Sequence, residues 1–368
     1  MNITLPRHTL LALLAQALPV VDKKSAMPIL SMVCMTAADG VLTMSATDLM
    51  VSYTGRRPAT VHTPGTVCID GAMFNAVVTK LPEGDITINV GKNYLAALTA
   101  AKGKRKANLT AMPGEDFPSI PPPSGTPIDI PAETLTALRS LTSYAMATDD
   151  TRPHLSAMLL EYSAGTLRAV TTDGHRLCKA ERPIAHDGPP WKALVPSSAL
   201  SRLRLAATGV VRFAMAGASG PVFFGDVEGN DAWSTKLVDA SFPSYSQVIP
   251  SDRGTRITCD RQQLRDALSA LTIVASDRTS GVKLRLAGGK LYLHSENPEV
   301  GDMDDELDAD VSNDRELVWG VNSRYPSQTL AALTGERVDL WVSGELDPMC
   351  ITLPDDDGFI AVIMPMRI

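Results

Sequence analysis

Apolar residues recur at helical spacing in six stretches of the chain, which fall into three pairs. The longer member of each pair is marked by Leu10, Leu13, Leu14 and Leu18, then by Leu135, Leu138, Leu141 and Ala145, and then by Leu264, Leu268, Leu271 and Ala275. The shorter member carries Phe74, Val77, Val78 and Leu81, then Leu200 and Leu203, then Leu330 and Leu333. This spacing predicts amphipathic helices over residues 6–18, 71–81, 132–146, 197–208, 260–275 and 324–334.

Between these stretches, apolar and polar residues alternate in short runs such as 87–90 (TINV), 211–213 (VRF) and 338–342 (VDLWV). Gly, Asp and Pro bound the runs, as expected for strands joined by turns. Each third of the chain is therefore predicted to be α+β, with strand predominating.

The same local pattern occurs three times. Residues 40–48 (GVLTMSATD) return as 165–173 (GTLRAVTTD) and more faintly as 289–297 (GKLYLHSEN), at offsets of 125 and 124. A period of this size matches a small domain rather than a solenoid repeat. Pro-rich stretches near 120–125 and 248–254 suggest connectors, so we predict three copies of one domain, at 1–122, 123–252 and 253–368.

Composition is that of an ordinary folded protein, with 44% hydrophobic and 20% charged residues. No apolar run approaches the roughly 18 residues of a membrane span, and the first residues lack the pattern of an export signal. The five cysteines are odd in number, scattered and never paired as Cys-x-x-Cys, which argues against a disulfide framework or a zinc site. A cytoplasmic protein without metal or cofactor is expected.

Charge is segregated by element type. The chain carries 34 basic and 41 acidic side chains, a net of −7, yet the six predicted helices hold eight Lys or Arg residues against three acids. Cations on one helical face can neutralise phosphates without reading sequence; alternatively, Arg is there as a good helix former. A basic run at 102–106 and an acidic one at 299–310 are both interpreted as solvated segments.

A search for catalytic motifs finds no phosphate loop, dinucleotide fingerprint, nucleophile elbow or zinc-binding helix. The one cluster of reactive side chains is 173–176, which contains Asp173, His175 and Arg176. Asp-Gly between two strand-like runs first of all predicts a hairpin turn. An enzyme using Asp173 and His175 is retained only as an alternative.

Several longer motifs occur in a fixed order: 26–30 (AMPIL), 151–155 (TRPHL), 172–177 (TDGHRL), 237–243 (LVDASFP) and 364–367 (MPMR). With these motifs the chain resembles, over its full length, the bacterial β sliding clamp, the processivity subunit of DNA polymerase III. The resemblance implies a non-enzymatic homodimer, in which two three-domain chains join head to tail into a ring. Helices would line a channel for duplex DNA, with the sheets outside.

The resemblance and the helical charge together imply sequence-independent contacts to DNA, at Arg7, Lys24, Lys80, Arg139, Arg152, His154, Arg202, Arg204 and Arg265. The resemblance also implies a groove in which short apolar motifs of the replicative polymerase, the clamp loader and repair proteins dock. The matching positions are Leu155, Thr172, Gly174, His175, Arg176, Leu177, Pro243, Val248, Val362, Met364, Pro365, Met366 and Arg367. Apolar members would hold the anchors, while His175 and Arg176 would orient the peptide backbone.

The implied subunit contact places Ile273 and Val274 against Leu109 of the other chain. Three positions depart from the family pattern: Gln247 stands where Arg is frequent, Pro326 enters the last helix, and Ala107 replaces an aromatic residue. A divergent paralogue that serves as a repair scaffold or as a drug-insensitive replacement clamp is the second hypothesis.

Overall fold

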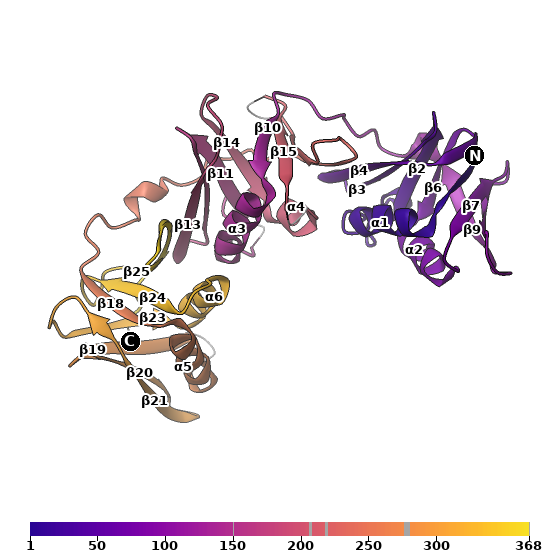
Figure 1. Cartoon of the computed structure of the whole chain (residues 1–368). Coiled ribbons are helices and arrows are strands. Elements are labelled where there is room, and N and C mark those ends of the chain that lie inside the picture. Colours follow the sequence, from indigo (N-terminus) through magenta and orange to yellow (C-terminus); the bar gives the residue numbers. More distant parts are fainter. Residues whose placement is uncertain (150, 206–207, 218–219, 276–279, 368) are drawn as a thin grey trace. The chain divides into compact units, whose positions relative to one another are not determined.

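The structure is a computed structural model that describes residues 1–149, 151–205, 208–217, 220–275 and 280–367. It contains a helix at each of the six predicted places (Figure 1): α1 Arg7–Ala17, α2 Gly71–Lys80, α3 Ala132–Thr142, α4 Ser197–Arg202, α5 Arg261–Val274 and α6 Arg324–Ala332. The predicted helix 132–146 finishes as a 3-10 turn, η3 (Ser143–Ala145). The predicted helix 197–208 is shorter than expected, and residues 206–207 lie outside the described residues.

Each third repeats one order of elements: a strand, the longer helix, a run of strands, the shorter helix and three further strands. The first third contains β1 Asn2–Pro6, β2 Met32–Ala38, β3 Val41–Thr47, β4 Val51–Pro58, β5 Thr60–Thr63, β6 Gly65–Asp70, β7 Asp85–Val90, β8 Leu95–Ala100 and β9 Lys106–Pro113. The second contains β10 Ile128–Pro131, β11 Ala157–Ser163, β12 Thr166–Thr172, β13 Arg176–Pro183, β14 Trp191–Pro196, β15 Val210–Met215, β16 Val222–Gly225 and β17 Asp231–Thr235. The third contains β18 Thr255–Asp260, β19 Gly281–Ala287, β20 Lys290–Asn297, β21 Gly301–Asp308, β22 Asp310–Val311, β23 Leu317–Asn322, β24 Arg337–Val342, β25 Met349–Leu353 and β26 Asp356–Ile363.

Strand pairing joins neighbouring thirds. A 13-stranded sheet runs β10-β15-β16-β17-β4-β3-β2-β6-β9-β8-β7-β1-β5, so β17 of the second third pairs with β4 of the first. A nine-stranded sheet runs β14-β11-β12-β13-β26-β25-β24-β18-β22, and a four-stranded one β21-β20-β19-β23. The chain accordingly divides into two compact units, Met1–Glu133 with Ser198–Leu237, and Thr134–Ser197 with Val238–Ile368. This division follows the sheets rather than the sequence repeat.

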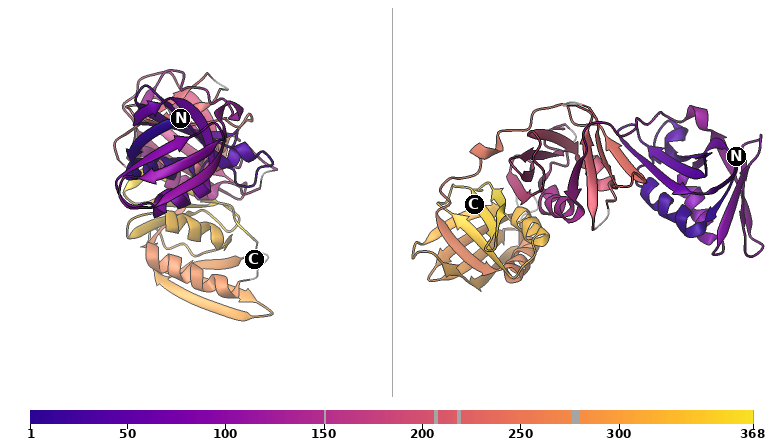
Figure 2. Two further views of the ribbon diagram at one scale, coloured as in Figure 1. Left: turned by 90° about the vertical axis from the view of Figure 1, so that its right-hand side faces the viewer. Right: turned by 45° about the horizontal axis from the view of Figure 1, so that its top comes forward.

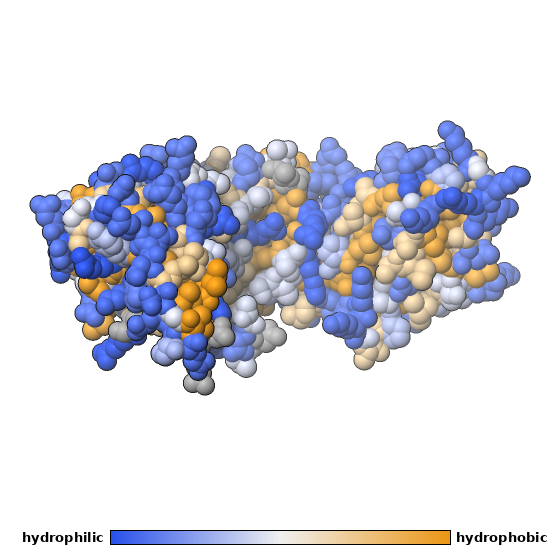
Figure 3. Space-filling model, turned by 90° about the horizontal axis from the view of Figure 1, so that it is seen from below, coloured by the Kyte–Doolittle hydropathy of each residue, from blue (hydrophilic) through white to orange (hydrophobic). Residues whose placement is uncertain are grey.

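The helices pack in pairs against these sheets. α1 contacts α2 in the first unit, and α5 contacts α6 in the second, and each pair lies on one side of its strands (Figures 1 and 2). Leu10, Leu13 and Leu14 on α1 are buried, as are Leu264, Leu268 and Leu271 on α5, which confirms the apolar faces read from the sequence. The surface seen from below in Figure 3 is largely hydrophilic, with separate apolar patches.

The first residue of a long helix holds the end of a short one in two of the repeats. Arg7 donates from Nε to the carbonyl of Val78, at 2.9 Å, and from its terminal nitrogen to that of Thr79, at 2.7 Å. Arg261 donates in the same way to the carbonyls of Leu330 and Gly335, at 3.0 and 2.7 Å. Because the last carbonyls of a helix lack intrahelical partners, both arginines stabilise helix termini.

Candidate functional site

A tight hairpin turn between β12 and β13 is the starting point of the candidate groove in the second unit. Oδ1 of Asp173 accepts hydrogen bonds from the backbone N–H groups of His175, at 2.9 Å, and Arg176, at 3.0 Å. Gly174 has a φ of 93°, in the region that favours glycine. The turn predicted from Asp-Gly is confirmed, and the Thr172 hydroxyl closes it by donating to the Arg176 carbonyl at 2.6 Å.

Arg176 fastens this turn to two other parts of the unit. Its guanidinium donates to Oδ2 of Asp173, at 3.0 Å, to the carbonyl of Tyr144, at 2.6 Å, and to the side-chain oxygen of Gln328 on α6. It lies over the rings of Tyr144 and Tyr325, at 5.5 and 4.8 Å from their centroids. The residue is only 8% exposed. Charge-assisted bonds of this kind fix geometry strongly, so Arg176 shapes the wall of the groove.

This placement changes the role expected for Arg176. The family resemblance predicts that Arg176 orients a bound peptide backbone, but three of its donors already serve Asp173, Tyr144 and Gln328. His175, in contrast, is exposed and its ring stacks on Tyr325 with centroids 6.3 Å apart. Arg176 therefore holds the turn in place, whereas the His175 side chain lies at the surface.

The hairpin turn continues into the seam between β13 and β26, which pair as antiparallel strands. Leu177 lies directly opposite Val362 across the seam, and both belong to an apolar cluster with Ala157, Leu159, Val170, Leu194, Cys350 and Ile360. Leu155, Leu177 and Val362 are all buried, Val362 completely. In this structure all three side chains lie beneath the surface. The exposed apolar groups are Met364, at 41%, and Val248 and Pro243 on the connector.

The segment that follows β26 is tied down at two points. The backbone N–H of Met364 donates to the carbonyl of His175, at 2.9 Å, and that of Met366 donates to Gly320, at 2.8 Å. Pro365 and Met366 are half-buried, whereas Met364 and Arg367 are exposed. The structure thus brings 172–177 and 362–367 together, and the flexible thioether side chain of Met364 is exposed beside them.

The connector after residue 238 packs on the same apolar cluster. Phe242, Tyr245 and Ile249 contact the apolar cluster, and the hydroxyl of Tyr245 donates to Glu161 on β11. Glu161 also pairs with Arg168, at 2.9 Å, and with Lys192, at 3.2 Å. Gln247 lies exposed in the 3-10 turn η4 (Tyr245–Gln247) of this connector. Tyr144, Glu161, Tyr245, Tyr325 and Gln328 were missed by the sequence analysis, because no local pattern indicates which distant segment they meet.

The Glu161 network should make the connector sensitive to acid. Burial acts to raise the pKa of Glu161, but hydrogen bonds from Tyr245, Arg168 and Lys192 outweigh it and leave the pKa below its ordinary value of 4.5. Glu181, which pairs with Arg168 at 2.7 Å, also has a lowered pKa, because its ion pairs outweigh burial. A carboxyl whose pKa is lowered by folding stabilises the folded protein at any pH above the pKa that it has in the unfolded chain. This stabilisation is lost as the pH falls through the pKa of the folded state.

We therefore expect the free energy of unfolding of the second unit to fall as pH drops below about 4.5. Glu161→Gln should flatten part of this dependence in urea titrations repeated from neutral to acid pH. Glu316→Gln, a change of an exposed carboxylate, is the matched control and should leave the slope unchanged. Equal slopes for wild type and Glu161→Gln would contradict the assignment.

The cations predicted to contact DNA differ in exposure. Within the observed helices, seven Lys or Arg residues stand against two carboxylates, leaving a net charge of five. Exposed members of the predicted set are Lys24, Lys80, Arg152, Arg204 and Arg265. Arg139, His154 and Arg202 are half-buried, and Arg202 pairs with Asp48. Arg7 is engaged with α2 and Glu83, so it is the weakest candidate for a phosphate contact.

Two open strand edges differ in charge, since one is acidic and the other begins at a basic run. β21 is the outermost strand of its sheet and bears Asp302, Asp304, Asp305, Glu306 and Asp308. In the first unit, residues 106–110 of β9 pair with β8 only, whereas β6 joins β9 at residues 111–113. This open stretch of β9 follows the basic run 102–106 and contains the half-buried Leu109. Such edges pair readily with strands of another chain.

Ile273, near the end of α5, is 79% exposed, and Val274 beside it is half-buried. Pro326, which departs from the family pattern, is the third residue of α6 and buried. A helix leaves its first N–H groups without intrahelical partners, so proline is accommodated there.

The two side chains named for the alternative of an enzyme, Asp173 and His175, both make structural contacts. The Asp173 carboxylate is occupied by the backbone of its own turn and by Arg176, and the His175 ring stacks on Tyr325. Among the residues that the structure describes, no group of His, Cys, Asp or Glu could hold a metal ion. Nor is any helix within the described ranges long and apolar enough to cross a membrane.

Three repeated α+β domains, joined by sheets that continue from one third of the chain to the next, define a protein of the clamp class. Comparison with known families agrees along the chain: residues 1–121, 129–244 and 246–367 match the N-terminal, central and C-terminal domains of the DNA polymerase III beta subunit. The chain belongs to the DNA polymerase III beta subunit family.

Individual relatives support this assignment over their full length. The chain is 31% identical to the beta sliding clamp of Pseudomonas putida and 28% identical to that of Escherichia coli, with complete coverage of both sequences in each pair. The crystal structure of the DNA polymerase III subunit beta from Pseudomonas aeruginosa superposes with a TM-score of 0.93, at 29% identity and complete coverage of both chains. The chain is a DNA sliding clamp of this family.

Proposed function

We propose that two copies of this chain close head to tail into a ring around duplex DNA and tether the replicative polymerase. The clamp loader and repair proteins would use the same tether through short apolar motifs. The observation that carries the proposal is the complementary pair of edges, the acidic β21 in the second unit and the stretch at 102–110, which begins with a basic run, in the first.

Head-to-tail pairing brings unlike edges together in both contacts of a dimer. The carboxylates of β21 would face Lys102, Lys104, Arg105 and Lys106 of the other chain, and the two sheets would continue across the contact. Ile273, Val274 and Leu109 would supply the apolar centre. Ala107 offers less apolar area than an aromatic residue, so the ring should close less firmly than in relatives that carry one.

Sliding requires contacts to phosphate without base readout. Lys80, Arg204 and Arg265 are exposed on or beside the helices, and the net charge of five per chain would double in a dimer. Phosphates attract such cations through counterion release, independently of sequence. Lys24, Arg139, Arg152, His154 and Arg202 would add to this set, while Arg7 would act mainly within α1 and α2.

The groove of the second unit would bind partners. Met364, Val248 and Pro243 offer apolar contacts, His175 and Arg367 offer polar ones, and Arg176 holds the turn between them. Competition for one groove would order the access of different proteins to DNA. We place the domain boundaries near 122 and 252, propose a non-catalytic role in the cytoplasm, and expect no cofactor.

The proposal predicts binding that depends on DNA topology. The protein is first loaded onto nicked circular duplex with the host's clamp loader and ATP. It should then co-elute with the circles in gel filtration at about 0.5 M salt, a concentration that suppresses contacts to phosphate. Linearising the circles with a restriction enzyme should release it. Equal retention on linear DNA, or no retention on circles by a dimeric protein, would overturn the proposal.

A charge variant separates tethering from attraction. The triple variant Lys80→Gln, Arg204→Gln and Arg265→Gln should remain on circles, yet its direct binding to linear duplex should depend less on salt. Each lost phosphate contact lowers the slope of log K against log salt by about 0.9. Arg315→Gln, which alters an exposed arginine outside this set, is the control.

A further inference from the structure

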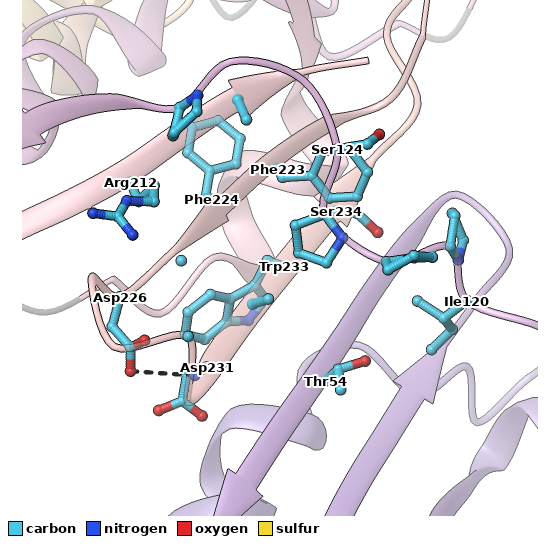
Figure 4. A pocket seen from close by; sticks show the side chains of 18 of the residues that line it. Thr54, Ile120, Ser124, Arg212, Phe223, Phe224, Asp226, Asp231, Trp233 and Ser234 are labelled. Carbon is cyan, nitrogen blue, oxygen red and sulfur yellow. Dashed lines mark hydrogen bonds between the residues drawn. The ribbon is translucent and has the colours of Figure 1, made fainter.

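A cavity of about 420 Å³ lies in the first unit, beneath the Pro-rich connector 120–127. Figure 4 shows the connector passing over strands that carry Phe223, Ser234 and, farther along, Thr54. The partner groove described above belongs to the second unit, so this cavity is a separate feature. Its volume falls within the roughly 300–1,000 Å³ typical of ligand sites.

The repeat places this cavity in register with the partner groove. Tyr53 lies opposite Trp233, and Cys178, 125 residues after Tyr53, lies opposite Ala361. One residue along, the row Trp341, Cys350, Val362 and Leu177 crosses the second junction, and the row Ala214, Phe223, Ser234 and Ser52 crosses the first. Each row faces the connector that follows a Phe-Pro-Ser motif, at 117–119 or 242–244.

Three of the four side chains in this row are smaller at the first junction, whereas Phe223 stands where the second junction has Cys350. Ala214 stands where the second junction has Trp341, and Ser234 and Ser52 stand where it has Val362 and Leu177. In the next row Gly225 lies opposite Ala232, and Ala232 opposite Thr54. The prolines of the connector and the ring of Phe223 give this hollow apolar walls.

Two arginines, Arg56 and Arg212, and two aspartates, Asp226 and Asp231, line the cavity, and they differ in how they are engaged. Asp231 is engaged by the Tyr53 hydroxyl and the Arg57 guanidinium, both at 2.6 Å, and Asp226 accepts from the backbone N–H groups of Asn230 and Asp231. Arg212 pairs with Asp129 at 3.1 Å. Arg56 is exposed, and within the described residues its guanidinium makes no hydrogen bond or ion pair. It is therefore available to a carboxylate.

We propose that this cavity is a second peptide-binding site, which takes one apolar side chain of a partner protein's segment and pairs an adjacent carboxylate with Arg56. The site goes beyond the proposed function, since it lies at a different junction and does not need a closed ring. Its occupant differs from that of the first groove in needing an acidic neighbour, because Arg56 supplies a cation where the repeat-related position, 125 residues later, is Glu181.

Photolabelling of the full chain tests the site directly. The probes are acetyl-photoleucyl-aspartate amide and its neutral counterpart, acetyl-photoleucyl-asparagine amide, with the labelled residues identified by peptide mass spectrometry. The acidic probe should label residues 120–127 and 223–234, about threefold to fivefold more than the neutral probe, as one exposed ion pair allows. Arg56→Gln should abolish this preference, and Arg315→Gln should preserve it.

A filling variant tests the hollow itself. Ala232→Leu places a larger side chain on its floor and should remove labelling at 120–127 and 223–234 while leaving the melting temperature of the protein within a few degrees. Labelling that is scattered over the surface, unchanged in Ala232→Leu, or equal for both probes would overturn the proposal. Because the probes are applied without DNA or loader, failure here leaves the ring proposal intact.

Discussion

Replacing Ile273 with aspartate is expected to convert the dimer into a monomer. Ile273 is the most exposed of the large apolar side chains within the described residues, at 79%, and burying it against a second chain would stabilise the contact by about 1.5–3 kcal/mol. A carboxylate at this position removes the stabilisation from burying an apolar side chain, and it adds the cost of an unpaired charge in the interface. Since a head-to-tail dimer contains the contact twice, its dissociation constant should rise at least about a thousandfold.

Sedimentation velocity at micromolar protein measures this change. Leu346→Asp is the matched control, because Leu346 is also a largely exposed apolar residue of the second unit but lies between β24 and β25. It should remain dimeric, and both variants should keep the wild-type melting temperature if the unit itself is unaffected. A dimeric Ile273→Asp protein, or a monomeric Leu346→Asp protein, would refute the proposed contact.

The helices were predictable because their signal is local. Leucines three and four positions apart specify a buried face whatever the rest of the chain does, and the structure confirms helices at all six places. The sheets were not, because register between distant strands leaves no mark within either strand. Nothing near Tyr53 indicates that Trp233 will lie opposite it.

The candidate groove shows the same division between local and distant information. The hairpin turn at 173–175 follows from Asp-Gly alone, and the structure confirms it. The surroundings of Arg176 depend on Tyr144 and on Gln328 of α6, which are 32 and 152 positions away. Residue type likewise could not distinguish Arg7, which binds the end of α2, from the exposed Arg265. The presence of a charged residue on a helix does not predict whether its side chain bonds to a neighbouring element or extends into solvent.

Replacing Arg176 with alanine is expected to have the largest effect within the second unit. The change removes bonds to Asp173, Tyr144 and Gln328 and leaves the Asp173 carboxylate without its cation. Breaking a buried, hydrogen-bonded ion pair costs about 3–5 kcal/mol of unfolding free energy. The turn would also lose its anchor on α6, so a peptide bearing the host polymerase's clamp-binding motif should bind at least about tenfold more weakly.

Two comparisons distinguish a positioning role for Arg176 from a direct contact with the peptide. Arg176→Lys keeps the charge but cannot serve three acceptors in fixed directions, so both stability and affinity should lie between those of wild type and alanine. Hydrogen exchange should quicken at 172–177 in the alanine variant before any peptide is added, because the anchor has been lost from the free protein. Arg152→Ala, which removes a single exposed bond to the Asp173 carbonyl, should change stability by less than about 0.5 kcal/mol. If Arg176→Ala instead weakened peptide binding while leaving stability and exchange at the turn unchanged, the guanidinium would contact the ligand itself, and the positioning role would be wrong.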